Sequence, residues 1–128
     1  NYGDIMNDNC LFCKIARKEV PAKILYEDDD ILVMLDAFPD TDGHTLIIPK
    51  KHYDDIYEVP NDILIKMFDI ARKETKNLMF KLDKSALTLL FNYGDAQAIK
   101  HIHLHLLPDF MHKTHNLDKE EVYNLLKD

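Results

Sequence analysis

A stretch in which three histidines alternate with apolar residues constrains the fold of this chain more than any other feature. It reads His101-Ile-His103-Leu-His105-Leu-Leu-Pro108. Successive side chains of a β-strand point to opposite faces, so the alternation predicts a strand whose three imidazoles share one face at intervals of about 6.5–7 Å. The apolar residues then face a core. Three histidines at this period favour a functional face over a polar strand face that is rich in histidine by chance.

A row of imidazoles has three chemical uses. It can bind a metal, hold an anion when partly protonated, or supply a nucleophile whose neighbours orient it and transfer protons. Side chains at neighbouring positions on one strand face point nearly parallel, so three of them converge poorly on one tetrahedral ion. One histidine that joins metal ligands from elsewhere in the chain is easier to build.

The remaining pattern predicts an α+β domain with a largely antiparallel sheet of about five strands, one long helix, a short N-terminal helix and a C-terminal helix. We expect residues 1–9 to form a flexible N-terminal segment and residues 10–128 to form a single domain. The predicted helices cover residues 10–18, 61–82 and 118–127. The predicted strands cover residues 23–27, 31–36, 45–48, 86–91 and the histidine stretch, with a turn at residues 92–95.

Several details of these elements follow from local signals. Asn9 is a candidate cap for the first helix, and Asn61 or Asp62 is a candidate cap for the long one. Asp118 and Glu121 form a capping-box pattern at the start of the last helix. The strand at residues 86–91 is an almost continuous apolar run, which predicts burial on both faces.

Composition narrows the function classes. Sixteen Lys and Arg against 23 Asp and Glu give a net charge of -7, which lacks the basic footprint of a general nucleic-acid or membrane-surface binder. No apolar run approaches the roughly 18 residues of a membrane-spanning helix. The polar N-terminus has no secretory signal, and two cysteines cannot make a disulfide framework. We therefore expect a cytoplasmic protein that binds neither nucleic acid nor membrane.

Three stretches of the chain resemble the histidine triad (HIT) superfamily, and most of all its Hint-like branch of small nucleotide-binding proteins with their bacterial relatives. Residues 11–22 resemble the opening helix of the family. Asp36-Ala-Phe-Pro39, followed by Gly43-His44-Thr-Leu-Ile-Ile-Pro-Lys-Lys-His52, resembles its central strand, and the histidine stretch is its signature. The resemblance covers roughly residues 10–108 and implies the HIT-like fold.

This resemblance implies nucleotidyl transfer or hydrolysis at the α-phosphate of a purine nucleotide such as AMP or an adenylate conjugate. His103 matches the nucleophile, which forms a covalent nucleotidyl-histidine that water later releases. His105 matches the neighbour that hydrogen-bonds the phosphate oxygens, and His101 and His44 complete the catalytic set. No magnesium requirement is expected, since imidazoles and backbone amides can neutralise one phosphate.

The resemblance also assigns nucleotide contacts. Asp36 matches a carboxylate that accepts hydrogen bonds from the ribose hydroxyls. Phe12 and Ile15 match the apolar wall of a base pocket, and Asn92 and Gln97 match residues near the phosphate or ribose. From the residues alone, Asp36 is better explained as a solvated residue that ends a strand. Helix packing explains Phe12 and Ile15 equally well and is compatible with a pocket wall, and Asn92 is a turn former before Gly94.

The cysteine pair Cys10 and Cys13 has three interpretations. In bacterial members of the superfamily such a pair is half of a structural zinc site, and the resemblance implies that His52 and His101 are its other ligands, with no position left for water. The alternatives are two small buried thiols or a redox pair. The thioredoxin context of a preceding strand is missing, so the redox alternative ranks last.

Two positions depart from the family pattern. Ala96 stands where the family commonly has Gly, and Ala98 stands where the phosphoramidase branch often has Ser, in a loop shorter than expected. That Ser helps to bind the phosphate or to protonate a leaving amine, so its absence argues against efficient phosphoramidate cleavage but leaves binding and slow turnover. The end of the stretch, from Leu107 onward, is closer to bacterial relatives and to dinucleoside polyphosphate hydrolases.

Four functional hypotheses follow. The first is cleavage of nucleoside 5′-phosphoramidates or related adenylates, and the second is hydrolysis of dinucleoside polyphosphates. The third is a nucleotide-binding or partner-binding module with weak or no catalysis. The fourth is a metal carrier that uses His103 and His105. The resemblance also implies a homodimer that joins two sheets through the long helix and the strand at residues 86–91.

Overall fold

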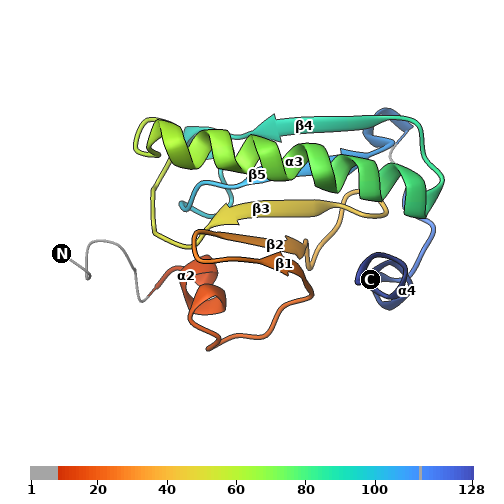
Figure 1. Cartoon of the computed structure of the whole chain (residues 1–128), viewed down its shortest axis with the longest axis horizontal. Coiled ribbons are helices and arrows are strands. Elements are labelled where there is room, and N and C mark those ends of the chain that lie inside the picture. Colours follow the sequence, from red (N-terminus) through yellow and green to blue (C-terminus); the bar gives the residue numbers. More distant parts are fainter. Residues whose placement is uncertain (1–8, 113) are drawn as a thin grey trace.

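One antiparallel sheet organises residues 9–112 and 114–128, which are the residues that the computed structural model describes. Within them five strands lie in the order β1-β2-β3-β5-β4 (Figure 1). The strands are β1 (Ile24–Glu27), β2 (Ile31–Leu35), β3 (Thr45–Pro49), β4 (Leu87–Phe91) and β5 (Leu104–Pro108). The predicted α+β class with an antiparallel sheet is confirmed. The predicted flexible segment at residues 1–9 lies, except for its last residue, outside the described residues.

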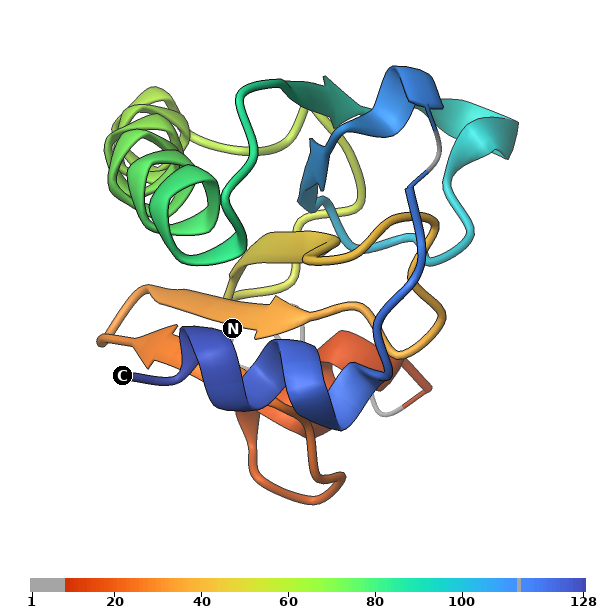
Figure 2. The ribbon, with the colours of Figure 1, turned by 90° about the vertical axis from the view of Figure 1, so that its right-hand side faces the viewer.

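Three α-helices in the described part of the chain surround the sheet. They are α2 (Leu11–Ala16), α3 (Asn61–Leu82) and α4 (Lys119–Leu126), and two short 3₁₀ helices are η1 (Gly94–Ala96) and η2 (Phe110–His112). The long helix α3 crosses one face of the sheet, and α2 and α4 lie on the side of β1 and β2 (Figures 1 and 2). None of the helices among these residues is long and apolar enough to cross a membrane.

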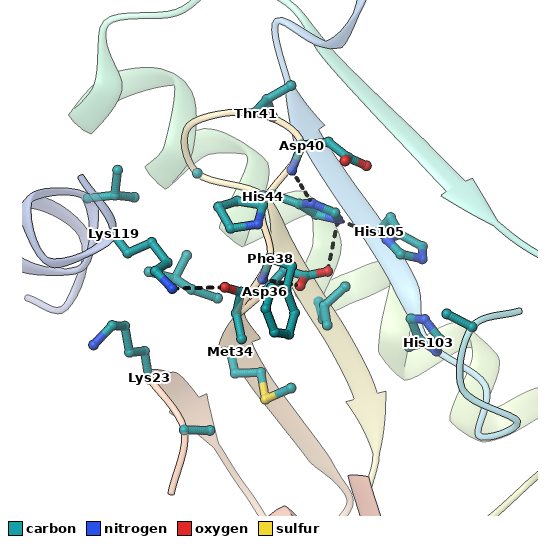
Figure 3. A pocket seen from close by; sticks show the side chains of 18 of the residues that line it. Lys23, Met34, Asp36, Phe38, Asp40, Thr41, His44, His103, His105 and Lys119 are labelled. Atoms are coloured by element: carbon teal, nitrogen blue, oxygen red, sulfur yellow. Dashed lines mark hydrogen bonds and ion pairs between the residues drawn. The ribbon is translucent and has the colours of Figure 1, made fainter. Parts of the chain in front are cut away.

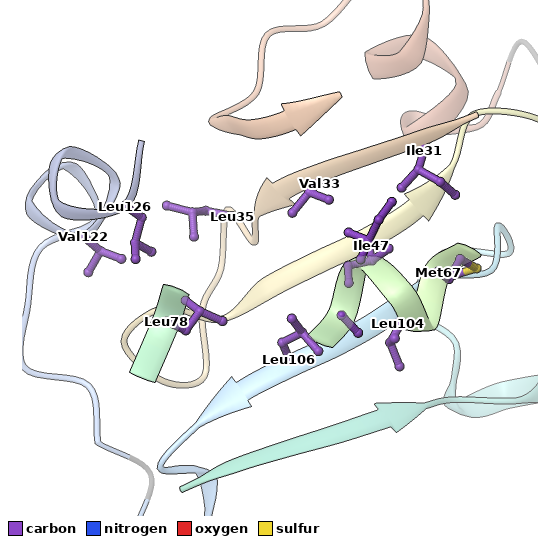
Figure 4. Close-up of a cluster of buried hydrophobic side chains, with 12 residues drawn as sticks. Ile31, Val33, Leu35, Ile47, Met67, Leu78, Leu104, Leu106, Val122 and Leu126 are labelled. Carbon is purple, nitrogen blue, oxygen red and sulfur yellow. The ribbon is translucent and has the colours of Figure 1, made fainter. Parts of the chain in front are cut away.

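Two apolar clusters hold the layers together, and strand β2 contributes to both. Its odd-numbered residues, such as Val33, pack with Ile47, Leu78 and Leu104 beneath α3 (Figure 4). The even-numbered residues of β2 pack against α2 in the second cluster. All five residues of β2 are therefore buried, as its unbroken apolar run requires. Val122 and Leu126 join α4 to the first cluster at the end of the sheet.

The predicted helix caps are only partly right. The thiol of Cys10, not the side chain of Asn9, accepts from the backbone N–H of Cys13 at the start of α2. Pro60 is the N-cap residue of α3, without a side-chain cap, because the extended backbone at Pro60 already places Asn61 and Asp62 within the first turn. Asp118 does cap α4, but it accepts from the N–H of Glu120 rather than that of Glu121.

Strand β4 differs most from its prediction. Among the described residues it pairs only with β5 and forms an edge of the sheet, and its side chains are half-buried or exposed rather than buried on both faces. Leu89 at its centre is 44% exposed. The histidine strand is also shorter than predicted. Strand β5 begins at Leu104, so only His105 of the three histidines lies within it, and His101 and His103 precede it.

Candidate active site and metal centre

The histidine stretch keeps its predicted alternation although its first half is not paired as a strand. Leu104 and Leu106 belong to the cluster beneath α3, while the histidine rings lie on the opposite face, towards α2. The ring centroids of His103 and His105 are 4.7 Å apart and tilted by 56°. His101 has different neighbours, since its ring meets two thiols and the ring of His52. The stretch thus serves two sites at once.

A cavity of about 790 Å³ opens on this face of the sheet. Figure 3 shows His103 and His105 along one side, Asp36 and His44 in the middle, and Lys23 and Lys119 at the other end. Its volume lies in the upper part of the roughly 300–1,000 Å³ range of ligand sites. Other lining residues come from α2, the loop before β1, the end of β2, the loop before β3, β3 itself, the segment between β4 and β5, and the C-terminal segment. They include Phe12, Ile15, Met34, Leu46, Asn92, Ala98, Ile99, Leu117 and Val122.

His103 has its tautomer fixed by the backbone. Its Nδ1–H donates to the carbonyl oxygen of His101 over 2.7 Å, as the hydrogen-bond pattern requires for a neutral ring. Nε2 is then the nitrogen with the free lone pair. Burial lowers the pKa of His103 from its ordinary value, although the carbonyl and the charge of Asp36 oppose this effect. The arrangement therefore provides a neutral, oriented imidazole in the wall of the cavity.

A second chain of hydrogen bonds orients His105. The backbone N–H of Asp40 donates to Nδ1 of His44 over 3.1 Å, so His44 carries its proton on Nε2. That Nε2–H donates to Nδ1 of His105 over 2.9 Å. The proton of neutral His105 must then lie on its Nε2. Burial lowers the pKa of His105 to about 3 and also lowers that of His44, so both rings are neutral near pH 7.

Asp36 supplies the negative charge nearest to these rings. Its Oδ2 lies 3.5 Å from Nε2 of His44, and its Oδ1 accepts from the backbone N–H of Phe38 over 2.8 Å. The Asp36 charge raises the pKa of His44 against the larger effect of burial. The side chain of Asp36 lines the cavity and is still partly exposed, so its oxygens can accept further hydrogen bonds from a ligand.

Of the residues predicted for catalysis and nucleotide binding, all but Gln97 and His101 line the cavity. Asn92 does, and its side-chain amide lies 3.5 Å from Nε2 of His105; since that Nε2 carries the proton, the amide oxygen is the group that can accept it. Gln97 instead braces the loop before the histidines, since its Nε2 donates to the carbonyl of Asp54 and its Oε1 accepts from the N–H of Gly94. The ring of His101 faces the cysteines, and its carbonyl oxygen accepts from His103 in the cavity wall.

Cys10, Cys13, His52 and His101 form the second site. Their ligand atoms lie within 4.8 Å of one another, and neither cysteine is in a disulfide. The distances from sulfur to Nδ1 are 3.3 Å for Cys10 and His101, 3.3 Å for Cys13 and His52, and 3.5 Å for Cys13 and His101. In a tetrahedral zinc site, metal–ligand bonds of about 2.0–2.3 Å place neighbouring sulfur and nitrogen atoms about 3.5 Å apart. The four residues therefore fit such an ion.

The outer hydrogen bonds of both histidines also suit a metal. Nε2–H of His101 donates to the carbonyl of Pro49, and Nε2–H of His52 donates to Oδ1 of Asp54, both over 2.7 Å. Each bond leaves Nδ1 unprotonated and aimed at the thiols. Burial lowers the pKa of His101 to about 4, which keeps that nitrogen available.

A second group of possible metal ligands, formed by Asp36, His44 and His105, does not pass the same test. The N–H of Asp40 occupies Nδ1 of His44, so Nε2 carries the proton and donates. A nitrogen that donates has no lone pair for a cation. The direction of the hydrogen bonds therefore separates the two groups: the cysteine group can hold a metal ion, and the cavity group is a relay of N–H donors.

The C-terminal wall of the cavity was not predicted. Asp42 is buried, and its carboxylate accepts from the backbone N–H groups of Asn116 and Leu117. These bonds hold the segment that leads into α4. Lys119 then donates from Nζ to the carbonyl of Ala37 over 3.1 Å. The partners are separated by more than 70 positions, so no local pattern reveals these contacts.

Two further observations concern predicted and overlooked side chains near this wall. His112 and His115, which follow the histidine stretch, are exposed, although His115 also lines the cavity. No sequence pattern points to Thr41. Its Oγ1 is buried beside the cavity and has no hydrogen-bond partner among the described residues.

The sequence and the fold both match known proteins. The sequence model of the HIT domain matches residues 17–112. An uncharacterised HIT-like protein of Methanocaldococcus jannaschii is 36% identical over 92% of this chain and 98% of its own length. Adenylylsulfatase HINT3 of Arabidopsis thaliana is 38% identical, and the match covers 80% of this chain but 53% of that protein.

A solved structure agrees with these matches. The crystal structure of a Zn-bound histidine triad family protein from Mycobacterium smegmatis has a TM-score of 0.85 and 33% identity, and the match covers 93% of this chain and 91% of that one. The domain match, the relatives and the shared fold all indicate the same family. This chain belongs to the histidine triad (HIT) family of nucleotide-binding hydrolases.

Proposed function

We propose that this protein hydrolyses adenylates or related purine nucleoside 5′-phosphate conjugates at the α-phosphorus through a covalent nucleotidyl-His103 intermediate. One observation carries the proposal. The carbonyl of His101 holds the Nδ1–H of His103 and so leaves Nε2 as a neutral nucleophile in the cavity wall. Desolvation keeps this ring uncharged at the pH where it must attack.

The first step forms the bond between Nε2 of His103 and the α-phosphorus and breaks the bond from phosphorus to the leaving group. The leaving group departs with the electron pair of the broken bond, and the ring becomes a cation that its Nδ1–H bond to His101 stabilises. Nε2–H of His105 donates to a phosphate oxygen as charge builds there. In the second step, water attacks the phosphorus and loses a proton to the solvent, and the bond to Nε2 breaks, with its electron pair returning to the ring, to release the nucleoside monophosphate and neutral His103.

The rest of the cavity suits a ribonucleoside. Asp36 would accept hydrogen bonds from the ribose hydroxyls, and the buried side chains of Phe12 and Ile15 would contact the base. Asn92 lies beside His105 and would donate to the phosphate. The neutral state of the rings means that the site would bind phosphate through oriented N–H donors rather than through fixed positive charges on the histidines.

Ala98 guides the choice of leaving group. A methyl side chain lines the cavity where the phosphoramidase branch often has a hydroxyl, so no hydroxyl at this position can protonate a leaving amine. An acidic leaving group such as sulfate departs without a proton. The similarity to adenylylsulfatase HINT3 also supports a substrate with sulfate as its leaving group. We therefore rank adenylates with acidic leaving groups above phosphoramidates, and dinucleoside polyphosphates remain the alternative substrate class.

We further propose that the cysteine centre binds structural zinc. Cys10, Cys13, His52 and His101 would take all four positions and join α2 to the histidine stretch, so the ion would supply cross-linking rather than catalysis. The Zn-bound relative from Mycobacterium smegmatis supports this assignment.

A homodimer and a cytoplasmic location are also part of the proposal. The open edge at β4 and the exposed apolar side chains of Ile65, Phe68 and Leu89 suit a partner that continues the sheet. The two thiols that the zinc proposal needs are stable as ligands in a reducing compartment. Light scattering over a range of protein concentrations tests the dimer, and a monomer at all concentrations would contradict it.

The decisive experiment compares turnover of adenylyl sulfate, adenosine 5′-phosphoramidate and diadenosine polyphosphates by the wild type and by His103→Ala. His112→Ala, an exposed histidine of the same chain, is the matched control. We expect turnover that is lost only in His103→Ala, and a quenched reaction whose mass spectrum shows AMP attached to His103. Nucleotide binding without any turnover would refute the hydrolase and favour a binding module. Turnover that survives in His103→Ala would refute the nucleophile.

A further inference from the structure

The cavity and the metal centre share a side chain. Phe12 lies between Cys10 and Cys13 in α2, is only 3% exposed, and also lines the cavity. Its ring meets the ring of His101 edge-on at 5.8 Å and the ring of His103 edge-on at 4.9 Å. A change in the position of α2 therefore changes the surroundings of a metal ligand and of the nucleophile together.

The two sites also share the backbone of His101. The ring of this fully buried residue points its Nδ1 at the sulfur atoms of Cys10 and Cys13. Its carbonyl oxygen accepts the Nδ1–H of His103 over 2.7 Å. The atoms that would hold the metal and the atom that orients the nucleophile thus belong to one rigidly packed residue.

Helix α2 cannot define these positions alone. It has six residues, which is too short for independent stability, and its N-cap group is the thiol of Cys10 itself. Besides packing against the second apolar cluster, it meets the histidine stretch through the ring of Phe12, and the thiols of Cys10 and Cys13 contact His101 and His52. An ion bound by all four groups would replace the sulfur–nitrogen contacts with coordinate bonds. It would also fix the ring of Phe12 against the rings of His101 and His103.

From these contacts we propose that a metal at the cysteine centre acts on the nucleotide site through two positioning groups, the ring of Phe12 and the carbonyl of His101. Metal and nucleotide then bind with positive coupling, in addition to any role of the metal in folding. The inference rests on the proposed nucleotide site. Coupling between two sites is reciprocal, so AMP must tighten zinc binding by the same factor by which zinc tightens AMP binding.

The test measures zinc affinity by competition with a chromophoric chelator, with and without saturating AMP. The proteins are the wild type, Phe12→Leu, and the control Phe38→Leu, which changes a phenylalanine at the exposed rim of the same cavity. We expect AMP to tighten zinc binding about fivefold or more in the wild type and in Phe38→Leu. In Phe12→Leu we expect both ligands to bind with most of this coupling lost.

A second measurement uses only the wild type and covers the case in which Phe12→Leu does not fold. With Co²⁺ in place of zinc, AMP should change the visible absorption of the cobalt thiolate centre. Zinc affinity that is independent of AMP, or an unchanged cobalt spectrum, would overturn the inference. Equal coupling in Phe12→Leu and the wild type would overturn it as well, since AMP would then act only by stabilising the folded state. A protein that binds zinc but no AMP would refute the proposed nucleotide site and this inference with it.

Discussion

Removal of the Asp36 charge should move the pH dependence of turnover in a direction set by the hydrogen-bond relay. His44 and His105 must be neutral for the chain of donors that begins at the N–H of Asp40. Burial lowers the pKa of His105 to about 3 and lowers that of His44, so activity should persist below pH 6.5 and disappear as the pH falls through the lowered values. The charge of Asp36 raises the His44 pKa, so Asp36→Asn should lower it further.

The size of the shift follows from the geometry. Oδ2 of Asp36 and Nε2 of His44 are 3.5 Å apart. Unit charges at this distance interact by about 1–5 kcal/mol for effective dielectric constants of about 80 to 20. Since one pH unit is about 1.4 kcal/mol, the range is about 1–3 pH units. The side chain of Asp36 is partly in solvent, which places the expected shift near the lower end, at about one unit.

The assay is kcat/KM from pH 4 to 8 with a substrate that does not titrate in this range, because this parameter reports the groups of the free enzyme. Asp36→Asn should weaken ribose binding at every pH and also move the acid limb to lower pH. Asp29→Asn, on an exposed turn, is the control and should leave the limb in place. A wild-type limb above pH 6.5, or a limb that moves to higher pH in Asp36→Asn, would refute the relay and its assignment of protons.

Three further predictions concern the metal centre and the fold. Asp54→Ala removes the carboxylate that accepts the Nε2–H of His52. The affinity for zinc, measured by competition with a chelator, should therefore fall about tenfold. An affinity equal to that of the control Asp55→Ala would contradict this prediction. Asp42→Ala breaks the carboxylate bonds to two backbone N–H groups and should lower the free energy of unfolding in urea by about 2–4 kcal/mol; a loss below about 0.5 kcal/mol would show that the C-terminal segment is held otherwise. Leu78→Ala, at a fully buried site, should lower the free energy of unfolding in urea by about 2–5 kcal/mol. The control Lys76→Ala, on the exposed face of α3, should lower it little. Equal effects of the two variants would contradict the packing of α3.

Elements with a strong local period were predictable from sequence, and their ends were not. Helix α3 has the predicted bounds because its apolar period continues over 22 residues. The predicted N-cap residue of α3 was wrong. The N-cap is the last residue with extended backbone before the helix, and in the structure this residue is Pro60. At α2 the predicted cap was one residue too early, since a thiol can serve as the acceptor where Asn9 was expected.

The prediction for β4 failed for a different reason. An apolar run from Leu87 to Phe91 is consistent with a strand in the middle of a sheet and with an edge strand that another surface covers. Sequence period carries no information about how many neighbours a strand has. The structure places β4 at the edge of its own sheet, where Leu87 and Phe91 pack against the cluster beneath α3 and Leu89 is exposed.

In the candidate site, too, the features that lie in short motifs were predictable from the sequence, and the contacts between distant residues were not. The histidine alternation and the cysteine spacing were legible because each is a short motif, and the HIT resemblance connected them. The division of labour at His101, whose ring and carbonyl serve different sites, needed coordinates. So did the contacts from Asp42 to the segment before α4, because residues that far apart in the chain have no shared local pattern.

The residues that line the cavity are spread along the sequence from Leu11 to Val122. During synthesis, the sheet and α3 can assemble while this site still lacks the side formed by Leu117, Lys119 and Val122. A nucleotide that needs the finished cavity therefore cannot assist the early stages of folding. It can only stabilise a chain whose last helix has docked, so bound ligand would report that the final segment is in place.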